Sequence, residues 1–378
     1  MLTRSPHDRS SSSLRRASRL VEQMPVPDPV AARSVDVLSD ALQAVRLTGA
    51  LFFVVDVSTP WVSRAPPGEA LVPVVIPHSQ HLVSYHLVSE GVCWCSVPGE
   101  PPMQLEAGDV VVVPHMDPYL LSSAPGMASA TPDVEMLEWF RQAMRGEQPA
   151  VVQEGGTGPL ELQVLCGFLG CDRRPFNPLL ATLPRMLRIR PNDEAGARLS
   201  QLVRFAVAEA RRQDVGSDCV LLRLGELIFV EMLRVHLSTA GERETGLLAG
   251  LRDSAVGQAL VLLHADPAHS WTLAELSRRV GRSRSALAYR FTELIGLAPM
   301  HYLAQWRMQM AAQRLSQDEA KVSAIAGEVG YESEAAFTRA FKKLVGVAPG
   351  TWRRERISGR RASRELVHSG RARAGKTA

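Results

Sequence analysis

A seventeen-residue segment of this chain occurs twice, as residues 283–299 and again, fifty positions later, as residues 333–349. Each copy begins with serine and ends with proline, and a glycine lies three residues before that proline. Short apolar runs that stop at glycine, residues 273–281 and 322–330, precede the two copies. The repeat therefore predicts one small helical domain with two equivalent helix pairs. The matching apolar positions are Leu287 and Phe337, Phe291 and Phe341, and Leu294 and Leu344.

The first copy specifies a helix, a sharp turn and a second helix. Thr272 is suited to cap the first helix, with Glu275 as its partner in a capping box. Gly281 supplies the left-handed residue that ends this helix, and Ser283 caps the next one. The second copy repeats the glycine and the serine. Two such units in one domain can present two helices to successive turns of a DNA groove, so the pattern predicts a DNA-reading protein.

The second helix of each pair has a face that its apolar core does not use. Arginine can read guanine, threonine or alanine can contact the thymine methyl group, and glutamate can accept from cytosine. We expect the base-facing residues to be Arg284, Ser285, Ala288 and Tyr289 in the first copy and Glu334, Ala335, Thr338 and Arg339 in the second. We expect the phosphate contacts that fix register to come from Lys342, Lys343, Arg353 and Arg354.

A connecting helix is predicted between the copies, because Leu303, Trp306 and Met310 form one apolar stripe. A rigid connector of this length can hold the two reading helices about one turn of B-DNA apart, roughly 34 Å. The spacing of the repeat therefore fits two successive segments of the major groove.

The charge is distributed unevenly along the chain. Residues 251–378 contain 21 basic and 11 acidic side chains, a net charge of +10, although the whole chain carries only +4. A basic C-terminal third on an acidic remainder is typical of a nucleic-acid-binding domain joined to another domain. A basic solvated tail is the alternative explanation, since residues 353–376 contribute much of the excess.

The C-terminal residues are similar to a known family. The stretches 326–331 (AGEVGY), 337–343 (FTRAFKK) and 346–349 (GVAP), followed by Trp352-Arg353, resemble the AraC/XylS signature over about 100 residues. Trp352 stands where the family usually has tyrosine. The resemblance implies a transcriptional regulator with two helix-turn-helix units and double-stranded DNA as partner. Activation, with RNA polymerase as a further partner, is the more usual activity in this family.

Between residues 35 and 190 the chain is rich in short β-type runs separated by glycine and proline, a pattern typical of a sandwich or small barrel. Hairpin turns are expected at residues 98–102 and 107–109. Amphipathic helices at 194–212 and 218–237 would form either a dimer interface or an internal cover. The fold class is therefore α+β. The expected strands are Leu51–Val57, Leu71–Pro77, His81–Val88, Val92–Val97 and Val110–Pro114.

The N-terminal region resembles a cupin. His86 with Glu90-Gly91 is similar to part of the first cupin motif, and residues 108–114 (GDVVVVP) are similar to the second. The wider pattern, with residues 85–91, 105–109 and 178–184, resembles the sensor domains attached to AraC-like regulators. This resemblance implies a small-molecule effector and a homodimer.

Six segments are expected from these observations. They are a disordered N-terminal segment (1–30), a cupin-like β-barrel or sandwich sensor domain (31–192), a helical dimerisation segment (193–240), a linker (241–251), the all-α double helix-turn-helix domain (252–356) and a basic disordered tail (357–378).

Four side chains are candidate metal ligands, because cupin enzymes bind metal through two or three histidines and one glutamate. They are His81, His86, Glu90 and His115. Tyr119 stands where the second motif usually supplies a histidine, so the set is depleted. The alternative is that His86 and Glu90 are structural polar residues in a barrel that encloses an organic effector or nothing.

The cysteines offer another candidate site. Cys93 and Cys95 share one face of a predicted strand, and Cys166 and Cys171 lie five residues apart. If a pair or all four converge, a zinc or redox-sensing site follows. The alternative is that these thiols fill the core. Five cysteines, an odd number, in a chain without an export signal argue for reduced thiols.

No apolar run approaches the roughly 18 residues that a membrane span needs, and residues 1–24 lack the apolar region of a secretory signal. We therefore expect a cytoplasmic protein without a membrane partner. We expect an effector-responsive, sequence-specific transcriptional regulator, an activator, with no cofactor and no catalytic residue. The alternative is a cupin-fold metal-dependent enzyme with a DNA-binding appendage.

Overall fold

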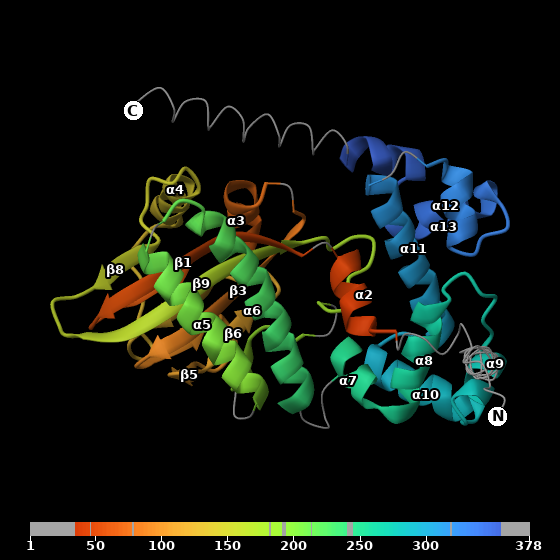
Figure 1. Cartoon of the computed structure of the whole chain (residues 1–378), viewed down its shortest axis with the longest axis horizontal. Helices are drawn as coiled ribbons and strands as arrows, with labels where there is room; N and C mark the ends of the chain where they lie inside the picture. The colour runs from red at the N-terminus through yellow and green to blue at the C-terminus, as the bar shows by residue number, and fades with distance from the viewer. Residues whose placement is uncertain are drawn as a thin grey trace, which may run out of the picture. The chain divides into compact units, whose positions relative to one another are not determined.

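The computed structural model describes residues 35–45, 47–77, 79–180, 183–190, 194–212, 214–239, 245–317 and 320–356. The predicted N-terminal segment (1–30) and the predicted tail (357–378) lie outside these residues. The described chain contains a strand-rich region, two long helices and an all-helical region (Figure 1). The expected α+β class is therefore confirmed.

The strand-rich region consists of two sheets. The larger has the strand order β10-β6-β3-β9-β1-β8, and the smaller has the order β2-β7-β4-β5. Neighbouring strands are antiparallel except β1 and β8, which are parallel. The bounds are β1 (Thr48–Ser58), β2 (Val62–Ala65), β3 (His81–Glu90), β4 (Val92–Ser96), β5 (Met103–Glu106), β6 (Val110–Val113), β7 (Tyr119–Ser122), β8 (Val151–Gly155), β9 (Leu160–Cys171) and β10 (Leu187–Ile189).

A single core lies between the two sheets. Successive side chains of a strand point to opposite faces of its sheet, and Phe53 of β1 and Cys166 and Phe168 of β9 share the inner face. They pack in one cluster with Cys93 and Cys95 from the smaller sheet. The inner face of this barrel is therefore apolar, and any polar side chain placed there needs a partner.

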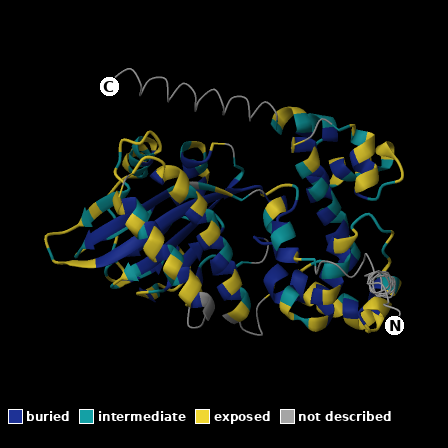
Figure 2. Cartoon of the chain, in the orientation of Figure 1, coloured by how far each residue is buried: buried dark blue, intermediate teal, exposed yellow. Residues whose placement is uncertain are grey.

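Helices α5 (Glu194–Arg212) and α6 (Ser217–Thr239) cover the outer face of the larger sheet (Figure 1). Their yellow, exposed positions alternate with blue, buried ones in Figure 2. The helix backbone comes so close to β1 that a Cβ at Gly49 would lie 2.6 Å from the Leu222 carbonyl oxygen. Asp56 of β1 also accepts a hydrogen bond from Arg211 of α5 at 3.1 Å.

The apolar stripes predicted for these two helices are largely buried within the monomer. Of the nine residues in the stripes, Leu202 is half-buried, and seven are buried: Leu199, Val203, Ala206, Leu224, Ile228, Met232 and Val235. Val220 is instead 38% exposed. The sequence left open whether these stripes form a dimer interface or an internal cover, and the structure shows that they form an internal cover of the sheet.

One predicted strand is wrong, because residues 71–77 belong mainly to a helix, α3 (Gly68–Val75). Leu71 and Val75 are buried one helical turn apart. This helix packs against α4 (Asp133–Met144), and a further short helix, α2 (Val37–Ala44), precedes the first strand. A short apolar run without alternation fits a helix or a strand equally well, which explains the error.

Of the two predicted hairpins, one is confirmed and one is wrong. Residues 98–102 join the antiparallel strands β4 and β5. Residues 107–109 lead instead from β5 in the smaller sheet to β6 in the larger one. The Asp109 carboxylate fixes this crossing, since it accepts from the Glu106 amide at 3.1 Å and from Arg190 at 2.9 and 3.0 Å.

The all-helical region begins earlier than predicted. Residues 247–251, assigned to the linker, lie in α7, which packs against α8 and α10 and buries Leu247 and Leu248. The predicted connecting helix is confirmed as α11, with Leu303 and Trp306 buried. None of the described helices is long and apolar enough to cross a membrane. The bounds are α7 (Leu247–Arg252), α8 (Ser254–Ala265), α9 (Leu273–Arg279), α10 (Arg284–Ile295), α11 (Pro299–Gln317), α12 (Val322–Glu328) and α13 (Glu334–Val345).

Candidate nucleic-acid interface and barrel cavity

The two helix-turn-helix units, α9–α10 and α12–α13, are built from the same local contacts. Ser283 Oγ accepts from the Ala286 amide at 3.2 Å, and Ser333 Oγ accepts from the Ala336 amide at the same distance. Gly281 has a φ of 65° and its counterpart in the second unit a φ of 82°, both in the left-handed region. The predicted serine caps and glycine turns are therefore confirmed.

The capping box at the start of α9 is only half formed. Thr272 Oγ1 accepts from the Glu275 amide at 3.1 Å, as predicted. The Glu275 carboxylate, however, lies 3.0 Å from His269 Nε2 and 3.3 Å from Arg279 Nη2, instead of accepting from the Thr272 amide. The hydrogen bond from His269 is the main reason why the pKa of Glu275 is lowered.

The apolar positions of the repeat are turned inward in both units. Leu287, Phe291 and Leu294 of α10 are buried, as are Phe337 and Phe341 of α13. The opposite face of each helix is thereby free for contacts outside the domain. Of the eight predicted base-facing residues, six are exposed, and Ala288 and Thr338 are half-buried.

Arginines on the reading helices differ in their intramolecular partners. Arg290 of α10 is engaged with Asp253 at 2.9 Å and Glu293 at 2.7 Å. Arg284 and Arg339 form no ion pair with any described residue, and both are exposed. These two guanidinium groups therefore lose no internal contact when they bind a base edge or a phosphate.

The predicted phosphate-binding residues fall into two groups. Lys342, Lys343 and Arg354 are exposed near the end of the domain. Arg353 is half-buried, and its guanidinium donates to the Ala320 carbonyl at 2.5 Å. Arg353 thus supports the segment that leads into α12, and its contact with phosphate stays a prediction.

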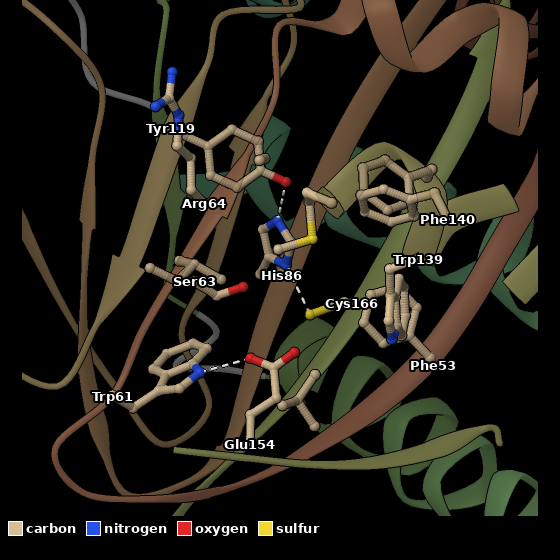
Figure 3. Close-up of a pocket in the computed structure, with 15 residues that line it drawn as sticks. Phe53, Trp61, Ser63, Arg64, His86, Tyr119, Trp139, Phe140, Glu154 and Cys166 are labelled. Carbon is tan, nitrogen blue, oxygen red and sulfur yellow. Dashed lines mark hydrogen bonds between the residues drawn. The ribbon is translucent and has the colours of Figure 1, made fainter. Parts of the chain in front are cut away.

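A small cavity of about 40 Å³ lies between the two sheets of the barrel, beside α4 (Figure 3). Its wall is rich in rings, and the lining also includes Arg64, Glu154, Cys166 and Met136. The aromatic and imidazole side chains in the wall are Phe53, Trp61, His86, Tyr119, Trp139, Phe140 and Phe168.

His86 is buried in the wall and uses both ring nitrogens. Nε2 lies 2.6 Å from the Tyr119 hydroxyl, and Nδ1 lies 3.0 Å from Cys166 Sγ. Burial lowers the pKa of His86 to about 3, so the ring is neutral and donates to one partner while it accepts from the other. Tyr119, which stands where a cupin motif usually has a histidine, thus satisfies this imidazole.

Two charged side chains complete the wall. Glu154 of β8 accepts a hydrogen bond from Trp61 Nε1 at 2.7 Å (Figure 3). Arg64 of β2 pairs with Asp133, the first residue of α4, at 3.2 Å. α4 also contributes Met136, Trp139 and Phe140 to the lining and therefore closes one side of the cavity.

Comparison with known proteins agrees with both parts of this architecture. Residues 36–238, more than half of the chain, match the cupin family model, and residues 276–355 match a helix-turn-helix domain model. An AraC-like transcription regulator of Streptomyces lividans is 33% identical over 275 residues, which cover 72% of this chain and 87% of that protein. One of Streptomyces antibioticus is 32% identical over 289 residues, covering 74% and 89%. The chain belongs to the AraC family of transcriptional regulators.

Solved structures match the helical region. An AraC-type DNA-binding domain protein from Chromobacterium violaceum is 24% identical, with a TM-score of 0.26, and covers 27% of this chain and 91% of that one. The family assignment comes from the sequence relatives. The family models and the sequence relatives confirm the expected family: the chain is a DNA-binding transcriptional regulator with a cupin domain and a helix-turn-helix domain.

The structure of this AraC-family regulator does not bring the predicted metal ligands together. His81 donates to the Pro114 carbonyl at 2.5 Å, and His115 donates to the Leu183 carbonyl at 2.7 Å. Glu90 is exposed at the end of β3. In the ranges that the structure describes, no three histidine, cysteine, aspartate or glutamate side chains are placed to hold a metal ion. Since His86 has no ring nitrogen to spare, the set does not fit a cupin metal.

The four candidate cysteines do not form one site either. Cys93, Cys95 and Cys166 lie in the barrel core, whereas Cys171, five residues beyond Cys166, faces the other side of β9 and accepts from Asn177. All five cysteines of the chain are free thiols. Burial raises the pKa of Cys93 and of Cys95 to about 12, so both are protonated and poorly reactive. The alternative, that these thiols fill the core, describes the structure better.

The sequence reasoning missed Trp61, Arg64, Trp139 and Glu154, which line the cavity. Only Trp61 and Trp139 had a usable signal, because tryptophan is scarce here, with six in the chain. Glu154 gave none, since a single glutamate in a polar stretch usually faces solvent.

Proposed function

We propose that this AraC-family regulator reads two neighbouring major-groove segments with α10 and α13. The observation that carries the proposal is the pair of capped twelve-residue helices whose outward faces hold Arg284 and Arg339 without an ion pair among the described residues. The proposed base contacts come from the eight residues named above, and Lys342 and Lys343 contact phosphates. DNA bound in this way is positioned by phosphates and selected by base edges.

We further propose that a small-molecule effector occupies the barrel cavity and shifts the protein between two conformations of different DNA affinity. The cavity wall supports this proposal, because a neutral, fully hydrogen-bonded His86 is suited to line a binding pocket and not to hold a metal. We also propose that the protein is a regulator without enzymatic activity, which the naming of its relatives as transcription regulators supports.

A second copy of the chain is the proposed partner of the outer face of α5 and α6. Phe205 is 53% exposed and Leu227 is 44% exposed, although the predicted stripes of both helices are largely buried. Phe205→Glu should yield a monomer where the wild-type protein sediments as a dimer. Arg204→Glu, on the neighbouring exposed position, is the matched control and should remain dimeric. A monomeric wild-type protein would contradict the proposal.

The DNA-reading proposal is tested by selecting genomic fragments that bind the purified full-length protein at near-physiological salt. We expect a recurrent motif with two half-elements about ten base pairs apart. Binding that depends on salt but not on sequence would contradict base reading. Because the proposed partner is chromosomal DNA, we also propose that the protein acts in the cytoplasm.

Transcription from such a fragment with purified RNA polymerase then tests activation. We expect the transcript level to rise when the regulator is added. A fall would identify a repressor and contradict the proposed contact with polymerase.

A further inference from the structure

We propose that the cavity beneath α4 receives a small organic cation, a protonated amine or a quaternary ammonium group, with Glu154 as its counter-charge. This inference rests on the proposed response to an effector and specifies the chemistry of that effector. It follows from the charges, rings and space around the cavity.

The wall of the cavity carries one uncompensated negative charge. Arg64 is neutralised by Asp133, whose carboxylate lies 3.2 Å from its Nε. Glu154 has no such cation: one of its oxygens accepts from Trp61 Nε1, and the other accepts no hydrogen bond from the described residues. A half-buried carboxylate with one neutral donor is poorly compensated, so a cation in the cavity would be stabilised there.

Aromatic rings surround the same space. The rings of Phe53 and Trp139 lie 5.2 Å apart between centroids, and Phe140 and Phe168 lie 5.4 Å apart. In the view of Figure 3, Glu154 lies between Trp61 on one side and Phe53 with Trp139 on the other. The faces of such rings attract ammonium groups, and tryptophan does so most strongly.

The neutral polar groups of the wall favour the same class of ligand. His86 is hydrogen-bonded to both Tyr119 and Cys166, and Trp61 donates to Glu154, so Ser63 carries the one remaining hydroxyl group in the lining. A sugar or another polyol would find few free donors and acceptors and would lose hydrogen bonds to water on entry. The lowered pKa of His86 also keeps the ring uncharged, so that it does not repel a cation.

Space for such a ligand requires a movement of α4. The cavity of about 40 Å³ holds little more than one water molecule. A second hollow of about 230 Å³ adjoins α4, β1 and α6, and Phe53 and Trp139 line both spaces. These two rings therefore separate the cavities, and an outward shift of Trp139 would enlarge the first towards Leu221 and Leu222 of α6.

The attachment of α4 permits this shift. Phe140 is its only fully buried residue, while Met136, Leu137 and Trp139 are partly buried against the core. Its ion pair from Asp133 to Arg64 is about two-fifths exposed on both sides. Exposed pairs of this kind hold a helix weakly. A cation that displaces α4 would thus act on α6, the helix that covers the outer face of the sheet.

Calorimetric titration of the full-length protein with choline and with its neutral isostere 3,3-dimethylbutan-1-ol tests the inference. We expect choline to bind the wild-type protein at least about tenfold more tightly than the isostere. Glu154→Gln should bring this ratio close to one. Glu161→Gln, which removes an exposed carboxylate on β9, is the matched control and should keep the wild-type ratio.

Equal affinities for the two probes, a ratio that survives Glu154→Gln, or no binding of choline to the wild-type protein would each overturn the inference. The wild-type ratio decides the question even if Glu154→Gln does not fold, which thermal melting reveals. Operator binding is measured on the same samples. The wild-type protein could bind both probes equally, bind its operator and still respond to a neutral ligand. That result would reject the cation but leave the proposed function unchanged.

Discussion

The two helix-turn-helix units pack apolar side chains inward at equivalent positions but have different outer surfaces. Both reading helices have twelve residues, a serine cap and a left-handed glycine at the end. Their exposed faces differ at equivalent positions: Arg284 corresponds to Glu334, and Tyr289 corresponds to Arg339. The shared interior fixes how each helix is presented, and the divergent surface fixes what it contacts. We therefore expect two half-elements with unrelated sequences.

Substitution of the turn glycines should give the largest difference in stability between the two units. A Cβ at Gly330 would lie 2.5 Å from the Ala268 carbonyl oxygen, whereas a Cβ at Gly281 meets no atom within 4 Å. Gly281→Ala should cost about 1 kcal/mol, because alanine is strained at positive φ. Gly330→Ala adds a clash with backbone and should cost roughly 3 kcal/mol or more. Urea unfolding measures both, and equal losses would show that the two turns are interchangeable.

The next largest effect should be on DNA binding, where substitutions on the two reading helices should give different results. Arg339→Ala and Arg284→Ala should each weaken operator binding by about 1–3 kcal/mol and relax base preference in a different half-element. Binding to a panel of single-base operator variants measures both. Lys343→Ala is the control, since loss of a phosphate contact should weaken binding to all sequences alike. If Arg339→Ala shows that uniform loss, Arg339 contacts phosphate.

The serine caps should behave identically in the two units. Ser283→Ala and Ser333→Ala each remove a hydrogen bond of 3.2 Å to a backbone amide. Each should lower the free energy of unfolding by about 1 kcal/mol. The double variant should lose the sum, because the caps lie in separate units. A large difference between the single variants would mean that the two caps do not contribute equally to the free energy of unfolding.

The helical units could be predicted closely because their signals are local. Caps such as Ser283 and turns such as Gly281 act within a few residues of their own position. Glu275 shows the limit of this reasoning, since its partner His269 lies outside the capping-box pattern. Arg353 shows the same limit, because this half-buried side chain donates a hydrogen bond to Ala320, 33 residues away.

The barrel was predicted less well because its organisation is non-local. The longest described strand, β9, is not among the strands whose bounds were expected from the sequence, and Gly167 within it weakens the strand pattern. The structure needs glycine there because the Tyr85 ring occupies the space of a Cβ. The cavity likewise joins Trp61 to Glu154, 93 residues apart, and His86 to Cys166, 80 residues apart. Such pairs follow from strand order, which no local pattern reveals.

The first helices of the two units offer the smallest and most specific comparison. Thr272 caps α9 with a side-chain hydrogen bond, whereas Lys321 begins α12 without one. Lys321 already has the extended ψ of 144° that an N-cap needs. Lys321→Asp should therefore stabilise the domain by about 0.5–1 kcal/mol, through a new cap and a favourable charge at the helix N-terminus. Lys321→Ala should change the unfolding free energy little, and an equal gain from alanine would assign the effect to removal of the lysine charge instead of to the cap.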